Sequence, residues 1–592
     1  MRAAVVLASV ALSAWLVVEA FAVAEDLETP RDLHRVSFVG SGACARCHPS
    51  HAASFEPTFH RTMTREASRE TVRAPFQGET LSYGGFVAHM TTEPDAEGTP
   101  RFVVTTTRRG EHGEELVVDR AIVARTVGSH RDQQLLTRED DRYVRMPVAW
   151  DIDESRWIHM NEAFLTPDPE GLDDDRVALT DYARHVVTWN DNCVFCHNVG
   201  PRPGLDPVTE RFSTEVAELG IACEACHGPG SEHVRVNASP LRRYALHGGG
   251  LGDRADPTIV SPSRLAPARA ADLCGRCHGQ RITEDIGRFL RDGDPFVPGE
   301  DLALYSAPLF ADTTLDGEPV FAPRFWSDGT ARLSAYEYQG YAQSRCASEG
   351  ELTCIDCHAM HEGDPRGQIR PAMTGDAMCT RCHDALVDPR RRADHVRPEG
   401  ARGVVVEGPA HVAVACVDCH MPRVVYGLRA MLRSHRIDSP PRRPGARTSD
   451  RLDACALCHL DGSDRGHDPS AAAPLDDLFA GDPIQRAAVT AALGRLDRSH
   501  AVGPSREARM ALLLEVMRDD RYPGVRSMAW AALREIAGIP IENSQFSPTD
   551  PRPRRMAQLG SLTQALGVAP LGPETHASLR ARASEQAIEI GE

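Results

Sequence analysis

One five-residue pattern, Cys-x-x-Cys-His, constrains this chain more than any other feature, because it occurs eight times and uses sixteen of the 17 cysteines. Two thiols spaced by two residues can form thioether bonds with the two vinyl groups of one haem, and the histidine after them can ligate its iron. The sequence therefore predicts eight covalently attached c-type haems. The attachment and ligand residues would be Cys44, Cys47 and His48; Cys193, Cys196 and His197; Cys223, Cys226 and His227; Cys274, Cys277 and His278; Cys354, Cys357 and His358; Cys379, Cys382 and His383; Cys416, Cys419 and His420; and Cys455, Cys458 and His459.

Zinc ribbons are the alternative, since paired Cys-x-x-Cys units also bind zinc. A zinc site does not require a histidine after every second cysteine, whereas every copy here has one. The pattern therefore favours haem. The remaining thiol, Cys346, is expected to be a small buried side chain without a redox role.

The N-terminus has the features of a secretory signal peptide. An apolar run follows Arg2 and ends before Glu19, and Ala22-Val23-Ala24 provides a cleavage site. An uncleaved membrane anchor is the alternative, but the run is shorter than the ~20 residues that a spanning helix needs. No later stretch is long and apolar enough to span a bilayer. We expect a periplasmic or otherwise exported protein with no transmembrane span after cleavage.

The charge balance narrows the possible partners. The formal net charge is −18, which disfavours nucleic-acid binding because phosphate contacts need a positive surface. All 66 basic residues are arginines, mainly through codon bias, although guanidinium groups can also hold haem propionates by paired hydrogen bonds. Without lysine, the chain cannot contain a catalytic haem with a proximal lysine ligand.

The spacing of the motifs divides the chain. Seven of them crowd into residues 193–459, which leaves too little chain for an ordinary apolar core around each. We expect a mainly α multihaem cytochrome c in which haems form the core, with a β-rich insertion near the N-terminus and a C-terminal α-helical repeat-like domain. The expected divisions are a signal peptide (1–24), a first haem segment (25–75), the β-rich insertion (76–165), a seven-haem domain (166–470) and a HEAT-like helical domain (471–592).

Two regions lack the motif. Segments 79–92, 101–109, 115–125 and 142–150 are rich in Val, Thr, Tyr and Phe and are separated by turn signals, so they are expected to be strands. This insertion contains no catalytic motif, and a supporting or partner-binding role is the simplest interpretation. Segments 483–493 and 523–533 share Pro, Arg and a final Ala-Ala-Leu at an offset of 40 residues, which is typical of HEAT repeats but also fits an ordinary helical bundle.

Longer segments around the motifs add a resemblance to a known family. They include CARCHPSHAASFEPTFHRTM from Cys44, TWNDNCVFCHN from Thr188, IACEACHGPGSEH from Ile221, TCIDCHAMH from Thr353, CVDCHMP from Cys416, SHR from Ser434 and DACALCH from Asp453. Over about residues 38–470 the chain resembles octahaem c-type cytochromes with doubled CXXCH motifs, which are distantly related to nitrifier tetrahaem cytochromes and hydroxylamine oxidoreductases. The resemblance implies multihaem electron transfer but supplies no substrate.

The resemblance also suggests second iron ligands among the 17 histidines outside the motifs. Imidazole on both faces of the iron is expected for low-potential electron carriers. The distal ligands implied by the family pattern are His60, His185, His233, His361, His395 and His435. Weaker candidates are His51, His130, His159 and His411, of which His159 and His411 are the first choices.

The sequence is compatible with three functions. The favoured one is an electron-transfer protein that passes electrons between redox partner proteins through closely spaced haems with filled coordination. The alternative is an oxidoreductase acting on a small nitrogen or sulfur oxyanion such as nitrite, hydroxylamine or tetrathionate, which needs one five-coordinate iron. The weakest is a scaffold whose C-terminal helices dock a redox partner. The sequence has enough histidines to fill every site, which favours the first.

Overall fold

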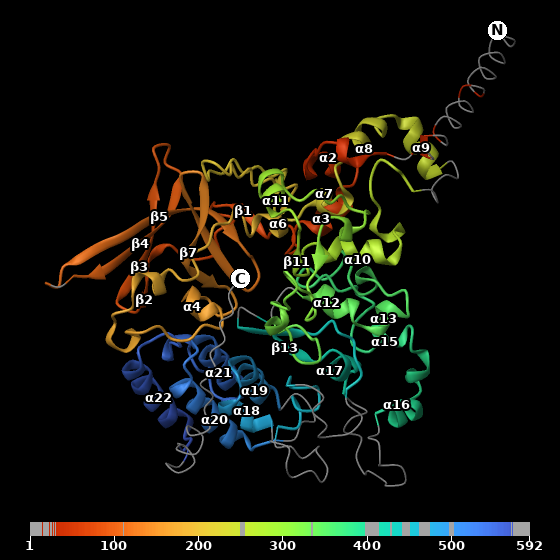
Figure 1. Cartoon of the computed structure of the whole chain (residues 1–592). Helices are drawn as coiled ribbons and strands as arrows, with labels where there is room; N and C mark the ends of the chain where they lie inside the picture. Colours follow the sequence, from red (N-terminus) through yellow and green to blue (C-terminus); the bar gives the residue numbers. More distant parts are fainter. Residues whose placement is uncertain are drawn as a thin grey trace.

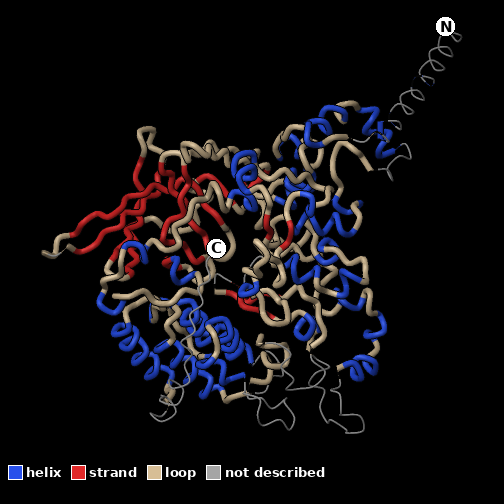
Figure 2. The backbone as a smooth tube through the Cα atoms, viewed as in Figure 1, coloured by secondary structure: helices blue, strands red, loops and turns tan. Residues whose placement is uncertain are grey.

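The computed structural model describes residues 31–110, 112–248, 255–332, 336–396, 414–426, 429–440, 450–460, 474–496 and 503–569, with a few isolated positions beside these ranges. Most of the expected signal peptide (1–24) lies outside them. An antiparallel sheet, a region of short motif-bearing helices and a group of longer C-terminal helices lie against one another (Figure 1). Figure 2 shows the strands gathered on one side, with helices beside and below them.

The sheet has eight strands and follows the order β2-β3-β4-β5-β6-β7-β8, with β1 paired to β5. All of these pairings are antiparallel, and four of them contain register shifts, which increase the local twist. The sheet curves until it is nearly closed. Its strands are β1 (Thr64–Glu66), β2 (Gln77–Tyr83), β3 (Phe86–Pro94), β4 (Pro100–Arg109), β5 (Glu115–Val127), β6 (Asp132–Glu139), β7 (Arg142–Asp151) and β8 (Arg156–His159).

The curved sheet encloses a hydrophobic core of its own. On β3, Phe86, Ala88 and Met90 are buried and the residues between them are partly exposed, because successive side chains point to opposite faces of a strand. Met90 and Leu135 belong to this core and are fully buried. The strands expected from composition at 79–92, 101–109, 115–125 and 142–150 therefore lie within β2 to β7.

The expected fold class is wrong. Helix accounts for 37% of the structure, and the large sheet contradicts a mainly α fold with haems as its core. The sheet begins at Thr64, and it packs directly on the second motif: Val127 and Leu136 share a cluster with Trp189 and Val194. Alternating burial along long paired strands builds an apolar interior here without any cofactor.

The motif-bearing region consists of short helices and two-stranded ribbons. The helices are α2 (Ser41–Ala45), α3 (Pro49–Phe55), α6 (Val194–His197), α7 (Cys223–His227), α8 (Ser231–Val236), α9 (Pro240–Gly248), α10 (Pro267–Gly275), α11 (Ile286–Asp292), α12 (Glu337–Ala342), α13 (Arg345–Ser348), α14 (Cys354–Cys357), α15 (Ala377–Thr380), α16 (Pro389–His395) and α17 (Cys416–His420). The ribbons pair β9 (Asn198–Val199) with β10 (Glu218–Leu219), β11 (Arg281–Ile282) with β12 (Ala307–Pro308), and β13 (Arg423–Tyr426) with β14 (Ala430–Arg433).

Longer helices form the C-terminal part. Asp482 caps α19 in a capping box with Gln485, and Pro occupies the first turn of α19, α21 and α22, where its missing N–H costs no hydrogen bond. No helix in the described ranges is long and apolar enough to cross a membrane. The helices are α18 (Asp477–Ala480), α19 (Pro483–Arg495), α20 (Arg506–Asp519), α21 (Pro523–Ile536) and α22 (Arg552–Leu566).

The C-terminal helices share one apolar core with the last motif. Leu452, Ala456 and Leu460, which surround Cys455 and His459 in sequence, belong to the same buried cluster as Leu493 and Leu533 of α19 and α21. The ribbon residues Val425 and Met431 also join this cluster. Two further helices, α4 (Met160–Ala163) and α5 (Leu179–Tyr182), connect the sheet to the rest of the chain.

A buried ionic junction fastens the sheet, the β13–β14 ribbon and the C-terminal helices together. The guanidinium of Arg429 lies 2.6 Å from Asp132, 2.8 Å from Asp151 and 3.3 Å from Glu162, and all four side chains are at most 8% exposed. The hydroxyl of Ser527 on α21 donates to Glu162 at 2.9 Å. Arg429 thus brings one cation from the ribbon to three carboxylates on the sheet side, of which Glu162 is also paired with Arg156.

Replacing Arg429 with methionine tests this junction. Removing one partner of a buried ion pair leaves uncompensated charge, so the free energy of unfolding should fall by about 3–5 kcal/mol. Urea denaturation followed by circular dichroism measures the change. Arg345→Met is the matched control, because Arg345 is 83% exposed in a surface pair with Glu349, and its loss should leave the free energy of unfolding almost unchanged. Equal effects of the two substitutions would contradict the role of Arg429.

Candidate haem sites

Each described motif forms one turn of helix, which brings its two thiols and its imidazole to one side of the backbone. In six motifs the backbone N–H of the histidine donates to the backbone carbonyl of the first cysteine over 2.8–3.2 Å, as in His48 with Cys44 and His459 with Cys455. The other two motifs lie wholly within α7 and α17. This i to i−4 bond is the basic unit of an α-helix, so the spacing of the motif suits a single turn.

Five motif histidines face a histidine from outside the motifs. The ring centres are 6.4 Å apart for His48 and His233, 6.3 Å for His227 and His361, 5.9 Å for His278 and His60, 6.4 Å for His358 and His435, and 5.8 Å for His420 and His395. Each pair joins one motif histidine to one residue of the predicted distal set.

These separations fit a metal ion held between two imidazoles. A bond from metal to imidazole nitrogen is about 2 Å long and the ring centre lies about 1 Å further, so rings on opposite faces have centres about 6 Å apart. Direct packing of aromatic rings would also allow shorter distances, such as the 4.5 Å between His51 and His361. The five pairs therefore have the donor set and spacing that a haem iron with two axial imidazoles requires.

The hydrogen bonds of the motif histidines orient the rings for this role. Nδ1–H donates to a backbone carbonyl in three of them: His227 to Val260 at 2.7 Å, His358 to Gly367 at 2.9 Å and His420 to Asp438 at 2.8 Å. A proton held on Nδ1 leaves the Nε2 lone pair available to a metal. The surrounding loops therefore select the tautomer that haem ligation needs.

Burial favours the neutral form, which is the form that binds a metal, in five of the ten paired rings. It lowers the pKa of His60 to about 4, and it also lowers the pKa values of His227, His358, His361 and His435. His278 behaves differently. Burial acts to lower its pKa, but the Glu337 carboxylate, 3.6 Å from Nδ1, outweighs burial and raises the pKa to about 9.

The motifs lie close to one another in space. Four thiol pairs from different motifs are within interaction distance: Cys44 with Cys223, Cys196 with Cys277, Cys274 with Cys354, and Cys379 with Cys416. Cys226 with Cys277, Cys357 with Cys382, and Cys419 with Cys458 are near enough to interact electrostatically. These contacts connect all eight motifs into one continuous array.

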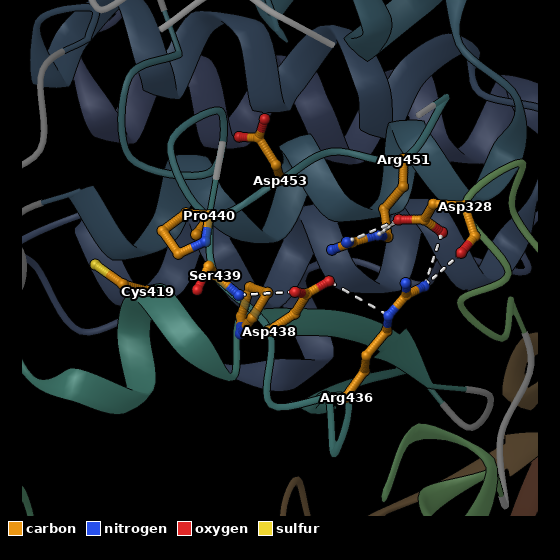
Figure 3. Close-up of a pocket in the computed structure, with 10 residues that line it drawn as sticks. Asp328, Cys419, Arg436, Asp438, Ser439, Pro440, Arg451 and Asp453 are labelled. Atoms are coloured by element: carbon orange, nitrogen blue, oxygen red, sulfur yellow. Dashed lines mark hydrogen bonds and ion pairs between the residues drawn. The ribbon is translucent and has the colours of Figure 1, made fainter. Parts of the chain in front are cut away.

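A cavity of about 300 Å³ lies between the seventh and eighth motif segments (Figure 3). Cys419 lines one end, and Arg436 and Arg451 lie at the other, where Arg451 pairs with Asp328 at 2.9 Å. Guanidinium groups bind carboxylates by charge-assisted hydrogen bonds. Arg436 is likewise paired with Asp438 at 3.3 Å, so the propionates of a haem attached through Cys419 would have to share or replace these aspartate partners.

The other histidine candidates are placed differently. His185 is 6% exposed and lies against Phe164 and Thr166, and no ring contact joins it to a motif histidine within the described part of the chain. His130 stacks on Phe59, and His159 stacks on Tyr83. His51 lies 6.0 Å from His48, on the same helical segment. His411 lies outside the described residues.

Some residues that shape the sites have no sequence signal. Glu224, only 3% exposed, accepts hydrogen bonds from the backbone N–H groups of Val39, Gly40 and Gly230, so it ties the first motif segment to the third. Glu337 contacts His278, and the side chain of Gln368 bonds Nδ1 of His60. These contacts join positions that are distant in sequence, so the sequence does not predict them. Only Glu224, which lies inside the third motif, could have been chosen as a site residue from the sequence.

Comparison with known proteins supports the assignment of the motifs. The family described as "Doubled CXXCH motif" matches residues 346–388, which contain the fifth and sixth motifs. A solved structure, "Crystal Structure of Outer Cell Wall Cytochrome OcwA", aligns with a TM-score of 0.44 and 18% identity over 84% of this chain and 99% of that chain. The search of curated proteins found no match. The family match supports covalent attachment of haem c at the fifth and sixth motifs.

Replacing one distal candidate tests the pairing of the rings. In His435→Ala the haem at the fifth motif should stay attached through its thioethers and His358, while its iron loses one axial ligand. A new high-spin signal should appear in the electron paramagnetic resonance (EPR) spectrum. His112→Ala is the control, because His112 lies exposed on the β4–β5 turn. Unchanged low-spin iron in His435→Ala would show that the two rings do not share a metal.

Proposed function

We propose that this chain is an exported octahaem cytochrome c that passes electrons between redox partner proteins. The observation that supports this proposal best is the set of five facing imidazole pairs. A haem iron with imidazole on both faces can be oxidised and reduced without binding a substrate. The motif cysteines and histidines, together with His60, His233, His361, His395 and His435, would hold the cofactors. His185 stays a candidate ligand.

The neighbour relations between motifs also support a conduit. The thiols of each motif lie close to those of at least one other motif, and none of the eight is isolated. Closely spaced redox centres allow electrons to move from site to site without diffusion of a carrier. The sheet and the C-terminal helices would hold the array in a fixed frame on two sides.

Intact-protein mass spectrometry tests cofactor loading and export. After expression with a haem-maturation system, the mass should correspond to a chain that begins near Glu25 and carries eight haems, because each motif holds one. Fewer than seven haems, or bound zinc in their place, would contradict the octahaem proposal. Retention of residues 1–24 would contradict export with signal cleavage.

A ligand-binding experiment separates the carrier from an oxidoreductase. The carrier proposal requires a second axial ligand at all eight irons, including the three for which no facing histidine is assigned. The oxidised protein should then not bind cyanide, and the reduced protein should not turn over nitrite, hydroxylamine or tetrathionate. It should still accept electrons from dithionite and return them to a soluble acceptor. The His435→Ala variant is the positive control, because its opened iron should bind cyanide. Cyanide binding and nitrite reduction by the unmutated protein would replace the carrier proposal with the oxidoreductase.

A further inference from the structure

We propose that the fourth motif site, formed by Cys274, Cys277 and His278 with His60 opposite, is electronically distinct from the other paired sites, and that Glu337 lowers its reduction potential. The proposal rests on the function proposed above, since it requires haem at this site. Two features mark the site. Its imidazole rings have an orientation that the other four pairs lack, and a carboxylate lies behind its motif histidine, whereas the His48–His233 pair has its carboxylate, Asp256, 3.3 Å from Nδ1 of the distal His233.

The first feature is ring orientation. The His60 and His278 rings are inclined by 82°, whereas the planes of the other four pairs differ by only 21–27°. The orientation of two axial imidazole planes determines how the iron d orbitals split, because each ring donates π density along one direction. Near-parallel rings give a rhombic low-spin EPR signal, and perpendicular rings give a highly anisotropic one. The site should therefore have a spectroscopic signature that the other four pairs lack.

The chain builds this orientation with specific contacts. The side chain of Gln368, which is 4% exposed, bonds Nδ1 of His60 on one face. On the other face, the carbonyl of His278 accepts a 2.9 Å bond from the N–H of Tyr338, the residue that follows Glu337. The His60 ring is therefore held by a side chain from outside the motifs, and the backbone of His278 is held next to the segment that carries Glu337.

The second feature is the anionic partner of His278. The Glu337 carboxylate lies 3.6 Å from Nδ1 of His278, whereas His227, His358 and His420 donate Nδ1–H to neutral backbone carbonyls. A carboxylate behind a ligating histidine makes the imidazole a stronger donor, which stabilises the oxidised iron and lowers the potential. Glu337 is a positioning and tuning residue in this account, since it acts through His278.

The location of the site gives this difference a consequence. Cys277 lies beside Cys196 of the second motif and near Cys226 of the third, and Cys274 lies beside Cys354 of the fifth. The fourth site thus neighbours three others. A shifted potential there would affect every route that crosses the centre of the array.

Low-temperature EPR during a potentiometric titration of the holoprotein tests the proposal. The oxidised protein should show a highly anisotropic low-spin signal beside the rhombic signals of the other four pairs, and His60→Ala should remove a highly anisotropic signal and replace it with a high-spin signal. In Glu337→Gln the anisotropic signal should titrate at a higher potential while the rhombic components stay in place. Glu337→Asp keeps the charge and should return the midpoint toward that of the unmutated protein.

Glu349→Gln makes the same chemical change at a surface glutamate, 61% exposed, and should shift nothing. An oxidised holoprotein without the anisotropic signal would overturn the proposal even if Glu337→Gln fails to mature. An unmoved midpoint in Glu337→Gln, or an equal shift in Glu349→Gln, would also overturn it. If eight haems are attached and all signals are rhombic, only this inference fails; if haems are missing, the octahaem proposal fails instead.

Discussion

We propose that ligation of one metal by two facing imidazoles is the constraint on which the motif-bearing region depends. Such a pair needs ring centres about 6 Å apart, and its members come from distant parts of the chain: His60 faces His278 and His227 faces His361. Each pair therefore closes a long loop. Short helices of four to nine residues, too short to be stable alone, would be held in place by these cross-links under the proposed ligation.

Two conventional cores support this region from the sides. The curved sheet packs on the second motif through Trp189 and Val194, and the C-terminal helices share a core with Leu460, which follows His459. Arg429 joins the sheet, the ribbon and the helices through three buried carboxylates. A fixed frame matters for electron transfer, because the rate falls steeply as redox centres move apart.

The features that the sequence predicts correctly are those that depend on residues close together in the chain. The Cys-x-x-Cys-His spacing predicts one helical turn and a haem site by itself, and the family resemblance pointed to five distal histidines that the structure places opposite motif histidines. Strand composition predicts the β-rich insertion, but the fold class failed because neither composition nor motif density shows that the strands pair into one large sheet with a core of its own. Glu337 could not be foreseen, since only tertiary packing brings it to His278.

Locating the irons in the holoprotein is the most direct test of this account. An anomalous difference map recorded at the iron edge should show eight peaks, with one peak between the two rings of each of the five pairs. The peak at the fourth motif should lie between His60 and His278. An iron found at any of these motifs with its second face turned away from the assigned histidine would contradict the account.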